Sequence, residues 1–512
     1  MNRRIGVIFS YILMAAEICS AMLFTPFLIR SLGQSEYGVY QLIFSITAYL
    51  ALLDLGISNA IIRYMAKYRA NNDMQKQREV LGIAVIFFAI IASLILVAGV
   101  VLNILFPYAF AEGLTTEEIS LAKKLLTINV INVAVTLGTS SFVSALYAYE
   151  KFALTKGANV ITLLVKMVIS FGALYLGFKS VAIMTISLLA NVALRAIYVY
   201  YAYFKLNLKP IFKNPDFALI KETVSYSAFI LLQMIATQIN SMVDSILLGA
   251  LTTASSVIIA IYGTGNQIIQ YFKTIGSHFT GVLMAGVVRL VENGAKAKDL
   301  QNEMVRIGRI ILLMLGMVFT VFLVNGKQFM ILWAGENYHQ SYTVAIAIMI
   351  PTMFTLIQSI GTQILWAMNK HKTQAIIQII SAIIHIVISV VLIKLYALEG
   401  AVISCFMALM IGDVICMNVM FKREIKISLI GYFKGLFKGI LPALTITGVS
   451  GVLFNLIGLE RYGWFGFIVN CAVMVAVYAV CVLTFGMNQS EKNMIFGMLN
   501  KILKKFRKVG EH

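Results

Sequence analysis

Charged side chains are scarce in this 512-residue chain. Asp, Glu, Lys and Arg make up 12% of the residues, whereas 60% are apolar and the mean hydropathy is +0.88. Soluble domains carry about 25% charged residues on average, so this composition does not suit a surface that faces water. The segments between apolar runs are also too short to hold a soluble catalytic domain. The composition therefore excludes a soluble enzyme and indicates an integral membrane protein.

Cysteine is sparse as well, and its positions exclude two kinds of site. All five cysteines fall inside apolar runs, at Cys19, Cys405, Cys416, Cys471 and Cys481. A disulfide framework is therefore not expected, and no Cys and His spacing typical of a metal site occurs. We expect neither a metal ion nor another cofactor.

Long apolar runs recur along the whole sequence, and each is long enough to cross a hydrocarbon core about 30 Å thick as a helix rising about 1.5 Å per residue. The alternating pattern of membrane β-strands is absent, which leaves helices as the way to satisfy the backbone in lipid. The sequence thus predicts an all-α membrane protein with fourteen transmembrane helices. Their expected ranges are residues 5–29, 38–64, 80–106, 121–147, 153–177, 181–204, 223–250, 257–284, 306–332, 342–368, 374–397, 400–421, 436–458 and 463–486.

The net charge of +19 is distributed unevenly between the two sides of these predicted helices. Loops on one side hold 30 of the 41 Lys and Arg residues, whereas the opposite loops hold 7. The positive-inside rule therefore places both termini in the cytoplasm, and the basic residues call for no nucleic-acid partner. The basic, amphipathic tail at 488–512 is expected to lie on anionic lipids of the inner leaflet, or else to be a solvated tail without a partner.

A faint internal repeat suggests how the helices are grouped. Residues 25–41 and 243–267 share a layout: an apolar helix end, a short polar turn, then Tyr and Gly entering the next helix. Repeats of this kind are typical of transporters. The expected divisions are an N-terminal lobe at 1–205 (helices 1–6), a cytoplasmic linker at 206–222, a C-terminal lobe at 223–424 (helices 7–12), two additional helices at 425–487, and the tail.

Polar residues inside the predicted helices recur at every third or fourth position, which places them on one face of each helix. Such stripes either line a water-filled cavity or join helices through hydrogen bonds worth about 0.6–2 kcal/mol each. The expected cavity lining comprises Asn159, Thr162, Asn191, Thr237, Asn240, Asn266, Gln270, Gln378 and His385.

Four cations accompany these stripes: Lys166, Arg195, Lys273 and Arg63. A charge at the centre of a membrane helix costs about 2.5–3.5 kcal/mol, and acidic partners at similar depth are too few to neutralise the set. A wet cationic cavity that binds an anionic passenger is the simpler account. Phosphate suits it, because Arg grips phosphate through two parallel hydrogen bonds and Lys acts as a point charge. Arg63 could instead reach the interface.

Four acidic residues also fall inside predicted helices: Glu17, Asp54, Asp244 and Asp413. Intramembrane carboxylates often couple transport to protons or sodium ions, although pairing with a neighbouring helix explains them equally well.

Three stretches resemble a known family: RSLGQSEYGVYQ at 30–41, LLDLGISNAIIRYMAKY at 52–68 and VDSILLGAL at 243–251. They are similar to the polysaccharide transport branch of the multidrug/oligosaccharidyl-lipid/polysaccharide exporter superfamily. The resemblance implies two six-helix lobes facing each other across a central cavity, with two additional C-terminal helices. It also implies a flippase in the bacterial cytoplasmic membrane that moves an undecaprenyl-pyrophosphate-linked oligosaccharide by alternating access, together with polysaccharide polymerase or ligase machinery as a partner.

Three other functions compete with this interpretation. A lipid II flippase belongs to the same superfamily and fits the same features. A cation-coupled drug exporter of that superfamily usually has twelve helices and an acidic cavity. A membrane polysaccharide polymerase or ligase needs a large outer loop with catalytic residues, and no catalytic pattern occurs in the short outer loops of this sequence.

Overall fold

The computed structural model describes residues 2–212, 217–368, 370–489 and 491–493, and these residues form helices without any strand. In the first half of the chain the helices are α1 (Asn2–Leu32), α2 (Gln34–Leu50), η1 (Ala51–Asp54), α3 (Ile57–Ala70), α4 (Met74–Ala109), α5 (Thr116–Gly138), α6 (Ser140–Ala148), α7 (Phe152–Tyr175), α8 (Ser180–Tyr200), η2 (Tyr201–Lys205) and α9 (Phe217–Leu251).

In the second half the helices are α10 (Ser255–Glu292), α11 (Ala297–Ala334), η3 (Glu336–Tyr338), α12 (Ser341–Ile357), α13 (Ser359–Ala367), α14 (His371–Ala408), η4 (Leu409–Cys416), α15 (Met417–Met420), η5 (Phe421–Ile425), α16 (Leu429–Phe437), α17 (Ile440–Leu456), η6 (Leu459–Tyr462), α18 (Gly463–Cys481) and η7 (Val482–Gly486). The predicted all-helical fold is confirmed for the described residues.

Eleven stretches of the described residues are long and apolar enough to cross a membrane, and a bent pair of helices raises the number to twelve. Twelve such stretches are two fewer than the fourteen predicted helices, and the two missing ones can be located. Helix α10 corresponds to the predicted helix at 257–284 but is not among the eleven, and the single stretch Lys372–Ile425 contains two predicted helices. Within that stretch Ala397 leaves helical geometry, with φ 46° and ψ −112°. The number fourteen and the cytoplasmic termini stay predictions.

Three predicted helices are broken rather than continuous. The helix at 38–64 is interrupted after η1, where Leu55 and Gly56 have positive φ angles of 52° and 72°. The helix at 121–147 breaks at Thr139 and the one at 342–368 at Gln358. A break resets the rotation of side chains around the axis. Residues before and after Gly56 therefore do not share a face by the simple count of 3.6 residues per turn.

The chain forms two compact units. Unit 1 comprises residues 1–263 and 378–408, and unit 2 comprises residues 264–377 and 409–512. The six-helix lobes expected from the sequence repeat stay a prediction. The predicted tail lies almost entirely outside the described residues, as do residues 213–216 of the predicted linker.

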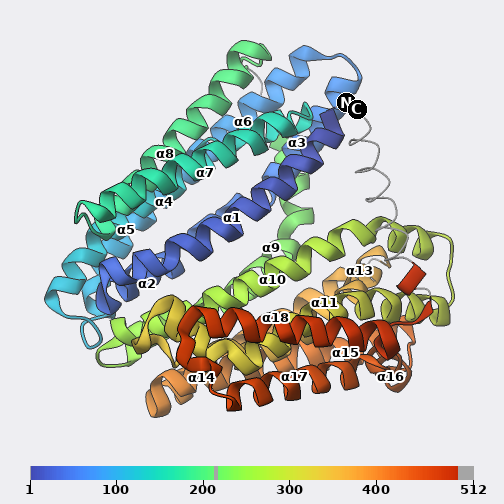
Figure 1. Ribbon diagram of the computed structural model, residues 1–512. Helices are drawn as coiled ribbons and strands as arrows, with labels where there is room; N and C mark the ends of the chain where they lie inside the picture. The colour runs from blue at the N-terminus through green and yellow to red at the C-terminus, as the bar shows by residue number, and fades with distance from the viewer. Residues whose placement is uncertain (1, 213–216, 369, 490, 494–512) are drawn as a thin grey trace, which may run out of the picture. The chain divides into compact units, whose positions relative to one another are not determined.

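Within unit 1, α1 packs against α7, α7 against α8, α8 against α5 and α5 against α4, and these long helices run side by side in Figure 1. Helix α2 packs against both α5 and α9. Large side chains fill the interior, among them Tyr37, Phe88, Tyr198 and Tyr262, each at most 2% exposed.

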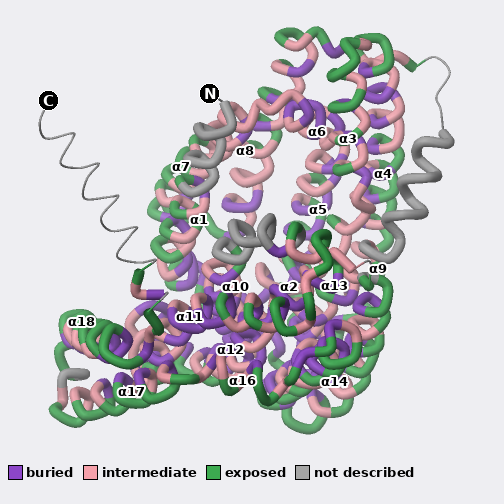
Figure 2. Tube along the Cα trace, turned by 90° about the vertical axis from the view of Figure 1, so that its right-hand side faces the viewer, coloured by how far each residue is buried: buried purple, intermediate pink, exposed green. Residues whose placement is uncertain are grey.

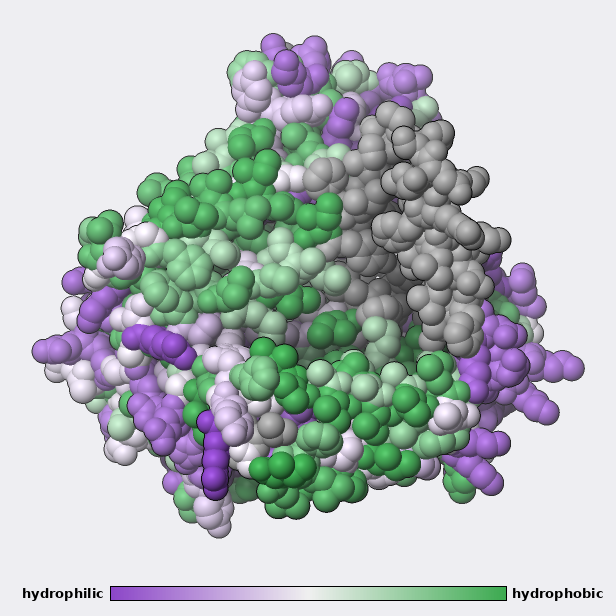
Figure 3. Space-filling view, in the orientation of Figure 1, coloured by the Kyte–Doolittle hydropathy of each residue, from purple (hydrophilic) through white to green (hydrophobic). Residues whose placement is uncertain are grey.

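Within unit 2, α11 is the central helix, since it contacts α12, α16, α17 and α18. Helices α17 and α18 carry mainly exposed residues on their outer faces (Figure 2), and many of these are apolar. On the side of the molecule in Figure 3, apolar side chains cover the middle of the helices and polar ones gather toward their ends. Both features are expected where helices face lipid.

Candidate functional site

Two of the predicted cavity cations lie on neighbouring helices of unit 1, Lys166 on α7 and Arg195 on α8. Both side chains are half-buried. Among the described residues, no carboxylate forms an ion pair with either one. The Arg195 Nε donates a hydrogen bond to the Asn191 Oδ1 one turn earlier, at 3.2 Å, and this leaves its terminal nitrogens available to an anion.

Asn191 itself is held by α5. Its Nδ2 donates to the Asn132 Oδ1 and to the Thr136 Oγ1, each at 2.8 Å. Because the Asn191 Nδ2 donates to side chains of α5, the Asn191 Oδ1 faces Arg195 and accepts its Nε hydrogen. This contact fixes the direction of the guanidinium. Asn191 is thus a positioning residue for Arg195 as well as a link between helices.

The other polar residues expected on α7 behave differently. Asn159 donates its amide to the backbone carbonyl of Thr155 on its own helix, at 2.9 Å. The same carbonyl accepts the Tyr198 hydroxyl, also at 2.9 Å, so that this end of α7 is tied to α8. Thr162 is half-buried. The part of this stripe at Thr155 and Asn159 therefore contributes more to helix packing than to a ligand site.

Three further predicted site residues of unit 1 have exposed side chains: Arg63 on α3, Glu17 on α1 and Thr237 on α9. The Thr237 hydroxyl donates to the Gln233 carbonyl one turn earlier, at 2.9 Å. Asp54 is half-buried at the end of η1, and its Oδ1 accepts the Ser58 hydroxyl at 2.6 Å. The structure does not bring Asp54 and Arg63 together as an ion pair.

The remaining predicted residues belong to unit 2 or to the end of unit 1. Asn266, Gln270 and Lys273 are half-buried on α10 in unit 2. Asp413 lies in the π-helix η4, where its backbone carbonyl accepts the Gln358 Nε2 at 2.8 Å. Gln378, on α14 in unit 1, keeps its Oε1 buried without a hydrogen bond from the described residues. A shared cavity lined by residues of both units stays a prediction.

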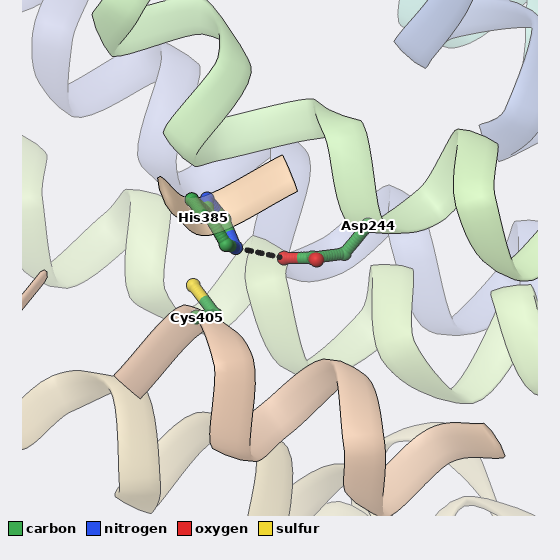
Figure 4. A group of neighbouring side chains, drawn as sticks. All are labelled: Asp244, His385 and Cys405. Atoms are coloured by element: carbon green, nitrogen blue, oxygen red, sulfur yellow. Dashed lines mark ion pairs between the residues drawn. The ribbon is translucent and has the colours of Figure 1, made fainter. Parts of the chain in front are cut away.

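Asp244 is the centre of a buried polar cluster of unit 1 (Figure 4). It lies on α9, is 1% exposed, and accepts hydrogen bonds from two neutral hydroxyl groups. The Tyr262 hydroxyl of α10 donates to its Oδ2 at 2.8 Å, and the Ser389 hydroxyl of α14 donates to its Oδ1 at 2.8 Å. These bonds offset part of the cost of removing a carboxylate from water.

His385 approaches the same carboxylate from α14 and is fully buried. Its Nε2 lies 3.3 Å from the Asp244 Oδ2, and its Nδ1 lies 3.1 Å from the Asn240 Oδ1. An amide oxygen only accepts, so Nδ1 must carry a proton to bond Asn240. A second proton on Nε2 then makes an imidazolium–carboxylate pair, whereas its loss leaves two acceptors facing each other. The contact is therefore stable with a cation or a proton between the two atoms.

Cys405 completes a possible ligand set beside this pair (Figure 4). Its Sγ, a carboxylate oxygen of Asp244 and a ring nitrogen of His385 all lie within 4.8 Å of one another. Such a donor set suits a transition metal such as zinc more than sodium, which prefers oxygen ligands. Tyr262 and Ser389 each donate to one oxygen of this carboxylate, and each oxygen can accept a second partner.

The sequence indicated parts of this cluster but not its assembly. Asp244 was expected as a coupling group, and Asn240 and His385 as cavity lining, on helices 7 and 11. No metal role was expected for Cys405, and Ser404, whose hydroxyl lies 2.9 Å from that of Ser389, was not singled out.

Comparison with known proteins supplies independent information. Residues 7–284, more than half of the chain, match the model of a family described as "Polysaccharide biosynthesis protein". A Shigella flexneri protein named "Putative O-antigen transporter" is 20% identical over 388 residues, covering 74% of this chain and 88% of that protein.

Solved structures with a similar fold include the lipid II flippase MurJ in an inward closed conformation, at a TM-score of 0.68 and 14% identity. That alignment covers 96% of this chain and 99% of the other. An inward-facing multidrug resistance MATE family transporter of the MOP superfamily aligns at a TM-score of 0.62 and 13% identity, over 79% of this chain and 96% of its own. At 13% and 14% sequence identity, these two alignments show that the fold is similar and nothing more.

Proposed function

Because the chain belongs to the polysaccharide biosynthesis protein family, we propose that it is a flippase for an oligosaccharide linked to a lipid through a pyrophosphate, undecaprenyl pyrophosphate in particular. It is a multi-pass protein of the bacterial inner membrane. In this proposal the oligosaccharide crosses by alternating access, with both termini in the cytoplasm and fourteen helices in the membrane. The protein is a transporter rather than an enzyme, and polymerase or ligase machinery receives its product.

The observation that carries this proposal is the pair of half-buried cations on α7 and α8. Lys166 and Arg195 have no carboxylate partner among the described residues, and Asn191 directs the guanidinium of Arg195. The pyrophosphate of the passenger supplies negative charge opposite Lys166 and Arg195. Lys273, in unit 2, is proposed to add a third cation to the same passenger, with Asn266 and Gln270 binding sugar hydroxyls.

The first prediction tests these cations. Hydrogen bonds to charged groups contribute about 1.5–3 kcal/mol, so Lys166→Gln or Arg195→Gln should slow flipping about tenfold to a hundredfold. The measurement is translocation of a fluorescent undecaprenyl-pyrophosphate oligosaccharide in proteoliposomes. The matched control is Lys394→Gln, which removes an exposed lysine of α14. Normal flipping by the Lys166→Gln and Arg195→Gln double variant would remove the cationic site from the proposal.

A lipid II flippase is the second candidate, because the MurJ structure aligns over nearly the whole of both chains. Both passengers carry a pyrophosphate, so the cations do not distinguish them. Proteoliposomes that contain each lipid separately do distinguish them: preference for lipid II would favour the second candidate, and preference for an oligosaccharide without peptide would favour the first.

We also propose that the Asp244 and His385 pair couples transport to protons. Proton release from Nε2 leaves acceptors 3.3 Å apart, and their repulsion favours separation of α9 from α14. Glu17, Asp54 and Asp413 remain secondary candidates, of which Asp54 already accepts the Ser58 hydroxyl.

A further inference from the structure

Several segments of unit 1 meet at the end that carries the connection from α3 to α4, at the top of Figure 1. The Arg69 Nη1 of α3 donates to the backbone carbonyl of Ala148, the last residue of α6, at 2.9 Å. The Arg78 Nε and Nη2 of α4 donate to the carbonyl of Asn207, just after η2, at 3.1 and 3.0 Å. These two arginines therefore hold the ends of α3, α4, α6 and η2 together.

Lysine side chains at this end lie over tyrosine rings. Four ammonium groups lie within 6.0 Å of a ring centre: Lys67 and Lys76 beside Tyr68, Lys151 beside Tyr201, and Lys209 beside Tyr203. We call these seven residues the tyrosine–lysine patch. A ring face attracts a cation without neutralising its charge. The patch therefore restrains each ammonium group and leaves its charge available to a ligand.

Acidic residues are too few to neutralise this end of unit 1. Residues 67–79, 149–156 and 201–212 contain eight Lys and Arg against three Asp and Glu. Asp73, one of the three, lies 3.8 Å from the Lys76 Nζ, and its Oδ1 accepts the Lys76 backbone N–H at 3.0 Å. The side chains of Lys67 and Lys209 are exposed. This end therefore presents a net positive charge to any molecule that approaches it.

Exposed aromatic side chains flank the lysines. Tyr200, Phe204 and Phe212 are each more than half exposed, and the Phe204 ring lies 5.2 Å from the Tyr200 ring. Rings beside basic residues at the end of a membrane helix are typical of the membrane–water interface. The charge distribution of the sequence predicts that this end faces the cytoplasm, where anionic lipids attract basic side chains. A lipid surface therefore suits the exposed rings and the lysines together, whereas a soluble acidic partner accounts for the lysines alone.

We propose that the tyrosine–lysine patch binds the headgroups of anionic phospholipids in the leaflet that it faces. The lysine ammonium groups bind the headgroup phosphate as point charges, and the exposed rings lie beside the acyl chains. This role goes beyond the proposed flipping, because it concerns lipids that stay in their leaflet. It uses none of the residues assigned to the passenger, and its test requires no flipping.

Photo-cross-linking in vesicles without passenger tests the patch. The protein is reconstituted in phosphatidylcholine vesicles that contain a little phosphatidylglycerol, whose acyl chain carries a photoreactive group close to the headgroup. Parallel vesicles contain phosphatidylcholine with the same group, and mass spectrometry locates the labelled peptides. Each lysine near an anionic membrane surface favours binding about fivefold. Peptides from the patch should therefore be labelled at least tenfold more by the anionic lipid than by the zwitterionic one.

A pair of matched double variants tests the lysines themselves. Lys67→Gln with Lys209→Gln removes two exposed charges of the patch and should lower its labelling by phosphatidylglycerol at least fivefold. Lys124→Gln with Lys394→Gln removes two exposed lysines of unit 1 on the side predicted to lie outside, and should leave that labelling unchanged. Equal labelling by the two lipids, or equal labelling of the two double variants, would overturn the proposal. Labelling of the patch by neither lipid would also overturn it, in favour of a soluble acidic partner.

Replacement of Tyr68 tests whether the rings hold the lysines. Tyr68→Phe keeps a ring beside Lys67 and Lys76 and should leave labelling unchanged. Tyr68→Ala removes the ring and should reduce labelling about twofold to fivefold, as expected for an exposed cation–π contact. Full labelling of the Tyr68→Ala variant would show that the ring does not position the lysines, and would contradict the arrangement proposed for the patch.

Discussion

Two buried carboxylates with basic partners lie in different units and are built in opposite ways. In unit 2, Glu491 binds Arg309 of α11 through two hydrogen bonds, at 2.6 and 3.1 Å. The remaining Arg309 donors bond backbone carbonyls, of which Lys438 and Gly486 are the nearest, at 2.7 Å each. In unit 1, Asp244 faces His385 and accepts the neutral hydroxyls of Tyr262 and Ser389.

The difference concerns whether a proton can be exchanged. Arginine does not lose its proton in proteins, and a guanidinium whose donors are all occupied holds one geometry. The Arg309 cluster therefore locks α11 to the loop before α17 and to the segment after α18. Histidine can gain or lose a proton, and each change alters its contact with Asp244. One cluster is suited to fastening helices, and the other to switching.

The largest effect is expected from breaking the fastening cluster. Arg309→Ala leaves Glu491 buried without its partner, and removal of one partner of a buried ion pair typically costs about 3–5 kcal/mol. The free energy of unfolding in lipid nanodiscs, or the abundance of the protein in membranes, should fall accordingly. Arg309→Lys should rescue little, because an ammonium cannot reproduce the bidentate bond.

Arg306→Ala is the matched control on the same helix. Arg306 pairs with Glu303 at the surface and is 51% exposed, so its loss should cost at most about 1 kcal/mol. Equal effects of the Arg306 and Arg309 replacements would show that burial does not distinguish the two pairs.

A smaller effect on stability but a specific effect on transport is expected from the switching cluster. Asp244→Asn keeps the size of the side chain and removes the charge that His385 faces. We expect flipping driven by a pH gradient to fall at least tenfold, while flipping without a gradient changes less. Rates in proteoliposomes with and without a proton gradient check this prediction.

Two comparisons sharpen the test of Asp244. Ser404→Ala removes a hydroxyl that touches Ser389 but not the carboxylate, and should leave the proton dependence in place. Replacement of the pH gradient by a sodium gradient separates the two ions: acceleration of the wild-type protein by sodium alone would contradict proton coupling.

The sequence anticipated Asn240, Asp244 and His385 of the switching cluster and missed the fastening cluster. Helical periodicity placed Asn240 and His385 among the polar stripes of two predicted helices. Their meeting depends on the packing of helices that lie far apart in sequence, which periodicity does not encode. Arg309 was not singled out, because charge counting does not reveal that Glu491 returns to it across 182 residues.

Local spacing was sufficient where partners are one turn apart. Asn191 and Arg195 lie four residues apart on α8, and that spacing alone would predict their hydrogen bond. The break at Leu55 and Gly56 was less accessible, because leucine rarely adopts the positive φ angle that it has here. The face assigned to the whole predicted helix at 38–64 therefore could not be correct across that break.

The smallest effect is expected where no charge is involved. Asn470 of α18 donates to the Asn325 Oδ1 of α11 at 2.9 Å and also bonds the Asn455 Oδ1 of α17. Hydrogen bonds between membrane helices contribute about 0.6 kcal/mol on average, so Asn470→Ala should destabilise unit 2 by about 1 kcal/mol and leave proton-driven flipping unchanged. The Asn325→Ala and Asn470→Ala double variant should lose less than the sum of the single losses, since both replacements delete the same bond. A loss as large as that of Arg309→Ala would mean that burial of any polar group, rather than the unpaired charge, determines the strength of the fastening cluster.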